Sequence, residues 1–175
     1  MRLFVAVEVP PFVRDAVAGA VAPLRAGLPG LRWVDPSRYH LTVVFLGSVG
    51  DSEVGAISDG VAAGCAGFAP FTLRLDGRIG TFGRRVVWAG LQRSPELTRL
   101  AGSVAGHLPQ PLELRDEAEF TAHLTLARAN RERVRLGELE AVAIPEMAWT
   151  VERVVLMRSA GGYEVVASFP LVADT

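Results

Sequence analysis

The order of strand-like and helix-like segments restricts the fold of this 175-residue chain more than any other feature. Short apolar segments that favour strands follow one another in pairs, and few helical patterns separate them. The order is roughly β-α-β-β-α-β-β-α-β-β-β. A fully parallel sheet needs a crossover, usually a helix, between successive strands, so this order predicts an α+β fold. Half of the residues are apolar, which is enough for a substantial core.

Gly, Pro and polar residues set the expected limits of the elements. Helices are expected after Pro10–Pro11, with Pro23 and Gly27 limiting the first, and behind N-caps at Asp51 and Ser94. The segment 77–83 has a glycine at every third position and is expected to be a loop between two strands. The predicted strands are 2–9, 31–34, 39–47, 71–77, 84–91, 122–128, 149–159 and 163–172, and a short segment at 112–115 precedes the strand at 122–128.

The word His-Leu-Thr occurs twice, beginning at His40 and at His123, each time inside an apolar segment that favours a strand. Alternate residues of a strand point to the same face, so His40 pairs with Thr42 and His123 with Thr125, while each leucine points the other way. The third histidine of the chain, His107, falls near the C-terminal end of a predicted helix. A partly charged imidazole interacts favourably with the negative end of the helix dipole there, so the position of His107 needs no catalytic role.

Two such strands in facing halves of the chain would line one cleft with two imidazoles and two hydroxyls. That set suits in-line attack at a phosphodiester, in which a neutral imidazole accepts a proton and an imidazolium protonates the leaving oxygen. Thr42 and Thr125 can donate to the non-bridging oxygens. Arg128 would add positive charge, but its odd spacing from His123 puts it on the other face of an ideal strand. The strand must end or bend near Ala127 for Arg128 to take part.

The composition excludes several kinds of chemistry. All 18 basic residues are arginines, so there is no Walker A lysine, no Schiff base and no lysine–nucleotide intermediate. A net charge of −1 gives no overall basic field for nucleic acid. The single cysteine, Cys65, can form neither an internal disulfide nor a thiolate metal cluster. No cofactor is expected.

A catalytic zinc ion is the main alternative for the two histidines. It usually needs three protein ligands, and His107 or a carboxylate would have to be the third. The chain has no HExxH motif and no closely spaced pair of histidines, so no metal is expected. The N-terminal segment lacks the pattern of a signal peptide, and no apolar run approaches the roughly 20 residues of a membrane span. A cytoplasmic protein without a membrane partner is expected.

The chain resembles the two-histidine phosphoesterase superfamily. Within it, the chain is most similar to the bacterial and archaeal RNA 2′,3′-cyclic phosphodiesterases, also called 2′-5′ RNA ligases. The resemblance is carried by "HLTVVFLG" and "HLTLAR" and extends over "RLFVAVEVP", Trp33, "TFGRRVVWAGL" and "GGYEVVASFPL". The family often has a proline just before the second histidine, where this chain has Ala122; the difference removes no chemical group.

The resemblance implies a bilobal α+β fold, in which two pseudo-twofold-related lobes, each with an antiparallel sheet and helices, enclose a central active-site cleft. One such domain is expected over 1–175, with lobes at about 1–80 and 81–175. The implied reaction is hydrolysis of an RNA 2′,3′-cyclic phosphodiester to a 2′-phosphomonoester, together with reversible 2′-5′ joining of RNA ends without ATP. By the same resemblance, His40 is the proton donor and His123 the proton acceptor. The substrate-binding residues are then Thr42, Thr125 and Arg128.

The expected partners are RNA ends or nucleotides that carry a 2′,3′-cyclic phosphate. The chain is expected to act as a monomer without an obligate protein partner. Its near-neutral charge keeps a phosphodiesterase for a small cyclic nucleotide as the alternative enzyme. A non-catalytic RNA- or nucleotide-binding domain of the same fold is the alternative outside enzymes. The presence of both histidines and both threonines favours an enzyme, because a binding module needs no pair of titrating groups.

Overall fold

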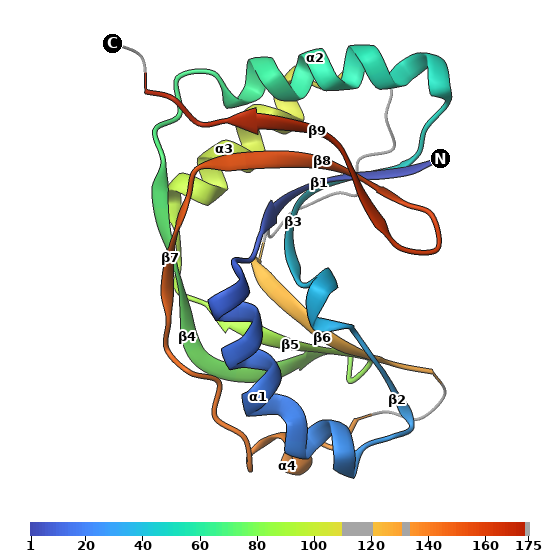
Figure 1. Ribbon diagram of the computed structural model, residues 1–175, viewed down its shortest axis with the longest axis vertical. Helices are drawn as coiled ribbons and strands as arrows, with labels where there is room; N and C mark the ends of the chain where they lie inside the picture. Colours follow the sequence, from blue (N-terminus) through green and yellow to red (C-terminus); the bar gives the residue numbers. More distant parts are fainter. Residues whose placement is uncertain (110–120, 131–133, 174–175) are drawn as a thin grey trace.

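Two antiparallel sheets with helices make up the fold, as Figure 1 shows, and this confirms the predicted α+β class. The computed structural model describes residues 1–109, 121–130 and 134–173. Within these residues, the sheet called A here has the strand order β3 (His40–Ser48), β1 (Arg2–Glu8), β8 (Arg153–Ser159) and β9 (Tyr163–Pro170). The sheet called B has the order β2 (Leu31–Trp33), β6 (His123–Ala129), β5 (Val86–Leu91), β4 (Phe71–Phe82) and β7 (Ala148–Val151).

Each sheet takes strands from both halves of the chain. The ranges 1–80 and 81–175 both contribute strands to sheet A and to sheet B. A division of the chain at residue 80 therefore does not separate the two sheets. The two-lobe division of a single domain therefore stays a prediction. The short segment at 112–115 lies outside the described residues.

The prediction of one strand over 149–159 is wrong, because the chain passes from one sheet to the other at Glu152. The residues before it form β7, which pairs with β4 in sheet B. The residues after it form β8, which pairs with β1 in sheet A. The Glu152 carbonyl accepts a hydrogen bond from the backbone N–H of Leu171, at 2.8 Å, beyond the end of β9. An unbroken β-favouring pattern carries no sign of such a change of partner.

The loop predicted over 77–83 is also wrong, since β4 continues to Phe82. Its ladder with β5 is irregular between Leu75 and Ile79, and Gly77 has a φ of +83° there. Gly80 lies against the indole of Trp88, and a Cβ at position 80 would come within 2.5 Å of that ring. The glycines therefore allow a bulge and a close approach inside a strand, rather than ending it.

The helices are α1 (Pro11–Gly27), α2 (Val54–Cys65), α3 (Pro95–His107) and the short α4 (Leu136–Leu139), with 3₁₀ turns η1 (Pro36–Arg38) and η2 (Asp51–Glu53). The predicted cap of α3 is confirmed, because the Ser94 hydroxyl accepts a hydrogen bond from the N–H of Leu97 at 3.2 Å. Pro23 does not end α1.

The N-cap predicted at Asp51 is wrong. Asp51 lies inside η2, and α2 starts only at Val54. At this end of the segment, the Glu53 carboxylate accepts a hydrogen bond from the backbone N–H of Gly50 at 2.7 Å. The sequence contains two acidic residues close together here, so the pattern could not tell which of them contacts the backbone.

The two faces of sheet A have different neighbours. One face packs on α2 and α3 within the main core, where Val5 and Leu41 are almost fully buried. Residues of the opposite face form a separate small cluster of Phe4, Ala6, Val155 and Met157. In the described part of the chain, none of the helices has both the length and the apolar character to cross a membrane.

Candidate active site

The two His-Leu-Thr words begin two strands that lie against each other. His40 is the first residue of β3 and His123 the first residue of β6, and these strands meet near the middle of the molecule in Figure 1. Leu41 and Leu124 are buried, at 1% and 0% exposure, while the histidine and threonine of each word are partly exposed. The alternation predicted for the two words is confirmed. Each strand also pairs antiparallel with a strand that precedes it in the chain, β1 for β3 and β5 for β6.

A bulge in β6 decides the position of Arg128. Thr125 lies opposite Trp88 and Ala127 lies opposite the neighbouring residue of β5, so Leu126 is an extra residue without a partner of its own. Such a residue inverts the alternation of the strand from that point. Arg128 therefore shares the face of His123 and Thr125, which an unbroken strand would not allow. The bend that the sequence required near Ala127 is present.

The first word is followed by the same irregularity. In β3, Thr42 lies opposite Ala6 and Val44 opposite Val5, which leaves Val43 as the extra residue. Phe45 thereby comes to the face of His40 and Thr42. It occupies the position in β3 that Arg128 occupies in β6, so the two words have equivalent backbones but different third side chains.

Both imidazoles are held by a backbone carbonyl two residues earlier. Nδ1 of His40 donates to the carbonyl of Arg38, and Nδ1 of His123 donates to the carbonyl of Thr121, each at 2.8 Å. A carbonyl oxygen can only accept, so the geometry assigns the proton to Nδ1 in both rings. Nε2 is then the nitrogen that remains to accept or release a proton.

Aromatic side chains contact both histidines. The ring of His40 lies 4.9 Å from that of Phe4 and 4.9 Å from that of Tyr163, the latter at an interplanar angle of 88°. The ring of His123 lies 4.8 Å from that of Phe82, at 83°. Tyr163 and Phe82 belong to the hairpins β8–β9 and β4–β5. Neither residue was predicted as part of the site, because nothing in the sequence brings those hairpins to the histidines.

The surroundings favour the neutral form of both imidazoles. Burial lowers the pKa of His40, the hydrogen bond to the Arg38 carbonyl opposes this, and the charges of Arg128 and His123 lower it further. Burial also lowers the pKa of His123. The hydrogen bond to the Thr121 carbonyl raises this pKa, and the charge of Arg128 lowers it further. Arg128 thus acts on both rings, and the two rings are close enough for the charge of His123 to act on His40.

A second arginine lies directly beside Arg128. In the ladder between β2 and β6, Arg32 is the partner of Arg128, so their side chains share one face. Like charges in directly opposite positions destabilise a sheet unless an anion separates them. Arg32 was not predicted as a site residue. A register between β2 and β6 was needed to find it.

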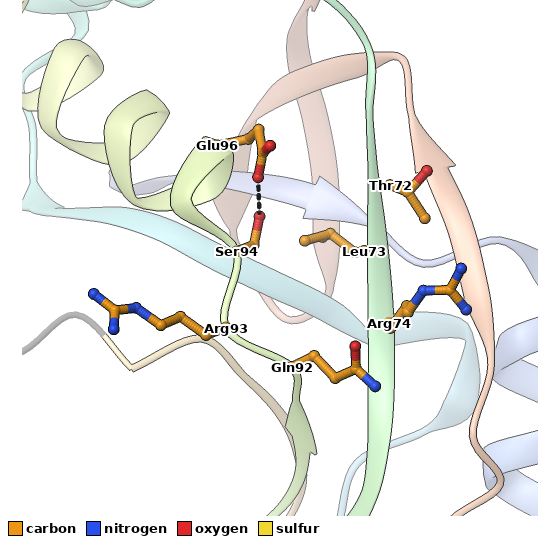
Figure 2. Close-up of a pocket in the computed structure, with 7 residues that line it drawn as sticks. All are labelled: Thr72, Leu73, Arg74, Gln92, Arg93, Ser94 and Glu96. Atoms are coloured by element: carbon orange, nitrogen blue, oxygen red, sulfur yellow. Dashed lines mark hydrogen bonds between the residues drawn. The ribbon is translucent and has the colours of Figure 1, made fainter.

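Two pockets differ in their relation to the histidines. One, of about 360 Å³, has His40 in its wall. The other, of about 180 Å³, lies between β4 and the start of α3 and contains no histidine. Figure 2 shows that its two arginines, Arg74 and Arg93, point away from each other, and its Ser94 already caps α3. We therefore place the candidate site at the first of the two pockets and the adjoining strands.

The third histidine lies apart from this site. His107 is exposed in the last turn of α3, where its Nδ1 donates to the carbonyl of Ser103 at 2.8 Å. Across the described ranges, no three His, Cys, Asp or Glu side chains come together as a metal site would require. His40 and His123 therefore have no third ligand of these types beside them among those residues.

Comparison with known proteins gives the family. The profile of the 2′-5′ RNA ligase superfamily matches residues 13–162, which include both His-Leu-Thr words. This chain belongs to that superfamily. A superfamily relative from Archaeoglobus fulgidus, named RNA 2′,3′-cyclic phosphodiesterase, is 36% identical over 143 residues, which are 79% of this chain and 78% of the relative.

Solved structures have the same fold. The crystal structure of TT0787 from Thermus thermophilus matches over the whole of both chains, with a TM-score of 0.82 and 28% identity. That of E. coli LigT complexed with 3′-AMP matches over 97% of each chain, with a TM-score of 0.72 and 26% identity. The arrangement of the two sheets is therefore shared with these proteins.

Proposed function

We propose that this protein is an RNA 2′,3′-cyclic phosphodiesterase that hydrolyses the cyclic phosphate at an RNA end to a 2′-phosphomonoester. The observation that carries the proposal is the pair of equivalent histidines. Each ring is held by a hydrogen bond from Nδ1 to a backbone carbonyl, and the positive charge of Arg128 lowers the pKa of both rings. The relative from A. fulgidus carries the same activity in its name, and LigT was crystallised with a nucleotide that has a 3′-phosphate.

In the proposed reaction, Nε2 of His123 accepts a proton from the attacking water. The water oxygen forms a bond to phosphorus while the bond from phosphorus to O3′ breaks, in line with the attack. Protonated His40 gives its proton from Nε2 to O3′, and the phosphate stays on O2′. The net consumption is one water molecule. The assignment of donor and acceptor is our inference from the family resemblance, since the hydrogen bonds of the two rings are alike.

Three side chains stabilise the negative charge of the phosphate in this proposal. The hydroxyls of Thr42 and Thr125 donate to the non-bridging oxygens from the faces of their histidines. Arg128 offers a guanidinium fork to the same oxygens, since the bulge at Leu126 brings it to that face. The bound anion also raises the pKa of the nearby imidazoles, which helps His40 to hold the proton that it must donate.

The same residues can support ligation. If the 5′-hydroxyl of a second RNA replaces the water, His123 accepts its proton, O3′ leaves with a proton from His40, and a 2′-5′ linkage remains. One phosphorus–oxygen bond forms and one breaks, so no ATP is needed. Because every step is reversible, the same site would also cleave a 2′-5′ linkage back to a cyclic phosphate.

The deciding experiment measures turnover of an oligonucleotide with a 2′,3′-cyclic phosphate by the wild type and by H40A, H123A and H107A. The first two variants should lose roughly 10²–10⁴-fold in kcat, the usual value of a positioned acid or base. H107A is the matched control and should keep the wild-type rate. Phosphorus NMR should identify a 2′-phosphomonoester as the product. A fully active H40A/H123A double variant, or a 3′-phosphate product, would contradict the mechanism.

The alternatives have their own readouts. Turnover of a nucleoside 2′,3′-cyclic phosphate but not of the oligonucleotide would identify a phosphodiesterase for small nucleotides, which the net charge of −1 leaves open. Binding of either without turnover would identify a non-catalytic module. We also propose that the chain acts as a monomer in the cytoplasm. Light scattering during gel filtration and cell fractionation test these two points.

A further inference from the structure

The pocket beside His40 is larger than the contacts of a phosphate require. It has a volume of about 360 Å³ and lies between the start of α1, the turn η1 and the β8–β9 hairpin. Its walls are formed by Glu8, Val9, Arg14, Ser37, Arg38, Tyr39, His40, Met157, Gly162, Tyr163 and Val165. A space of this size beside one histidine can hold a nucleoside-sized group.

The charge inside this pocket is positive. Glu8, the single carboxylate in its wall, already accepts hydrogen bonds from Nε and Nη2 of Arg153, at 3.1 and 2.9 Å. Arg14 and Arg38 have only long hydrogen bonds to backbone carbonyls, of Ser37 at 3.4 Å and of Gly161 at 3.3 Å. These contacts satisfy one N–H each and neutralise no charge.

One carboxylate outside the wall lies near Arg38. Asp35 accepts hydrogen bonds from the hydroxyl and the backbone N–H of Ser37, at 2.6 and 2.9 Å. These hydrogen bonds lower the pKa of Asp35, and the charge of Arg38 adds to the effect at longer range. In the described part of the chain, neither Arg14 nor Arg38 forms an ion pair within 4.0 Å. Both guanidiniums can therefore take up an anion.

The far wall of the pocket is aromatic. Tyr163 is 40% exposed and touches His40 edge to face, so part of its surface is open beside the histidine. The guanidinium of Arg38 lies 6.0 Å from the centre of the Tyr163 ring, next to the turn that contains Gly162. An exposed aromatic surface beside arginines is the combination that binds a base and its backbone phosphate in single-stranded nucleic acids.

The proposed reaction fixes which part of the substrate lies on this side. The leaving oxygen O3′ belongs to the ribose of the terminal nucleotide, and His40 protonates it. The attacking water comes from the opposite side of phosphorus, where His123 lies. The ribose, its base and whatever is attached to its 5′ carbon must therefore lie on the side of His40, which is the side with the pocket.

We propose that the pocket beside His40 holds the terminal nucleoside, and that Arg14 and Arg38 bind the phosphate on its 5′ side. This inference rests on the proposed function and adds to it. It makes the cyclic end of an RNA chain, or a nucleotide with a 5′-phosphate, a better substrate than an isolated nucleoside cyclic phosphate. Two local arginines give this preference without a basic overall charge.

The test compares adenosine 2′,3′-cyclic phosphate with the same compound carrying a 5′-phosphate. The wild type should show a kcat/KM higher by roughly tenfold to a hundredfold for the 5′-phosphorylated substrate, as expected for charge-assisted hydrogen bonds. This ratio should fall with added salt. In R14A/R38A the ratio should approach one. R93A, whose arginine lies in the separate pocket of Figure 2, should keep the wild-type ratio.

The possible failures can be told apart. A wild-type ratio near one, or a ratio that R14A/R38A leaves unchanged, would overturn the assignment of the 5′-phosphate while the cyclic phosphodiesterase stands. Turnover of neither compound nor of an oligonucleotide would overturn the proposed function and this inference together. Thermal melting of each variant ensures that a changed ratio does not come from unfolded protein.

Discussion

Replacing Gly64 with alanine should separate two helices that now touch through their backbones. Gly64 lies on the face of α2 that packs on α3. A Cβ at this position would come within 2.5 Å of the Cα and 2.9 Å of the nitrogen of Val104, and within 3.1 Å of the carbonyl oxygen of Ser103. None of these atoms can move aside by a change of rotamer, so the helices themselves must shift.

The size of the effect follows from these distances. Carbon atoms in contact prefer about 3.5–4.0 Å, so the helices must move apart by roughly 1 Å. Overpacking of this kind costs about 1–3 kcal/mol. The gain in helix propensity from Gly to Ala returns up to about 1 kcal/mol. We expect a net loss of about 1–2 kcal/mol in the free energy of unfolding, or about 2–8 °C in Tm for a chain of this length.

The matched control is G102A. Gly102 lies in the middle of α3, and a Cβ there has nothing within 4 Å, so only the propensity changes. This variant should gain about 0.5–1 kcal/mol. Urea unfolding followed by circular dichroism measures both variants, with the m-value checked for constancy. If G64A were as stable as G102A, the close packing of α2 on α3 through glycine would be wrong.

Three further predictions concern the site and the core. Sulfate binding at pH 7 should take up protons, because the lowered pKa values of His40 and His123 leave both rings neutral until an anion favours their charged forms; calorimetry in buffers of different ionisation enthalpy measures this, and buffer-independent heats would refute it. R32S should raise Tm slightly, because it relieves the repulsion between Arg32 and Arg128. It should also weaken sulfate binding by roughly twofold to fivefold, because it removes a positive charge beside Arg128. A lower Tm would contradict this. Cys65 is 3% exposed and burial raises the pKa of its thiol to about 11, so a disulfide reagent should label it at least roughly a hundredfold more slowly than in urea; equal rates would refute its burial.

The sequence was informative at most places where local rules decide the structure, although the local N-cap prediction at Asp51 was wrong. The same-face alternation of His40 with Thr42 and the cap at Ser94 depend only on neighbours in the chain, and both predictions are confirmed. The α+β class followed from the order of elements in the same way. These features need no information about which strand pairs with which.

The missed features of the site and of the sheets depend on pairing between distant strands. The face of Arg128 is set by the bulge at Leu126, which exists only in the register with β5. The contact of Tyr163 with His40, and the position of Arg32 beside Arg128, likewise require strands that are far apart in the sequence. The break at Glu152 is a change of sheet inside one β-favouring segment. Composition and periodicity carry no record of such partners.

The equivalence of the two His-Leu-Thr strands has a consequence for how such a protein can change. Both imidazoles bind a carbonyl two residues earlier, at the same distance, and both strands bulge one residue after the threonine. Nothing within the words themselves distinguishes an acid from a base. Under the proposed mechanism, the residues around the two words would decide which histidine is the acid: Phe45 beside the first word, Arg128 beside the second, and the pocket beside His40. Over evolutionary time, a descendant could accept its substrate in the reverse orientation by remodelling those surroundings, with every residue of both words left untouched.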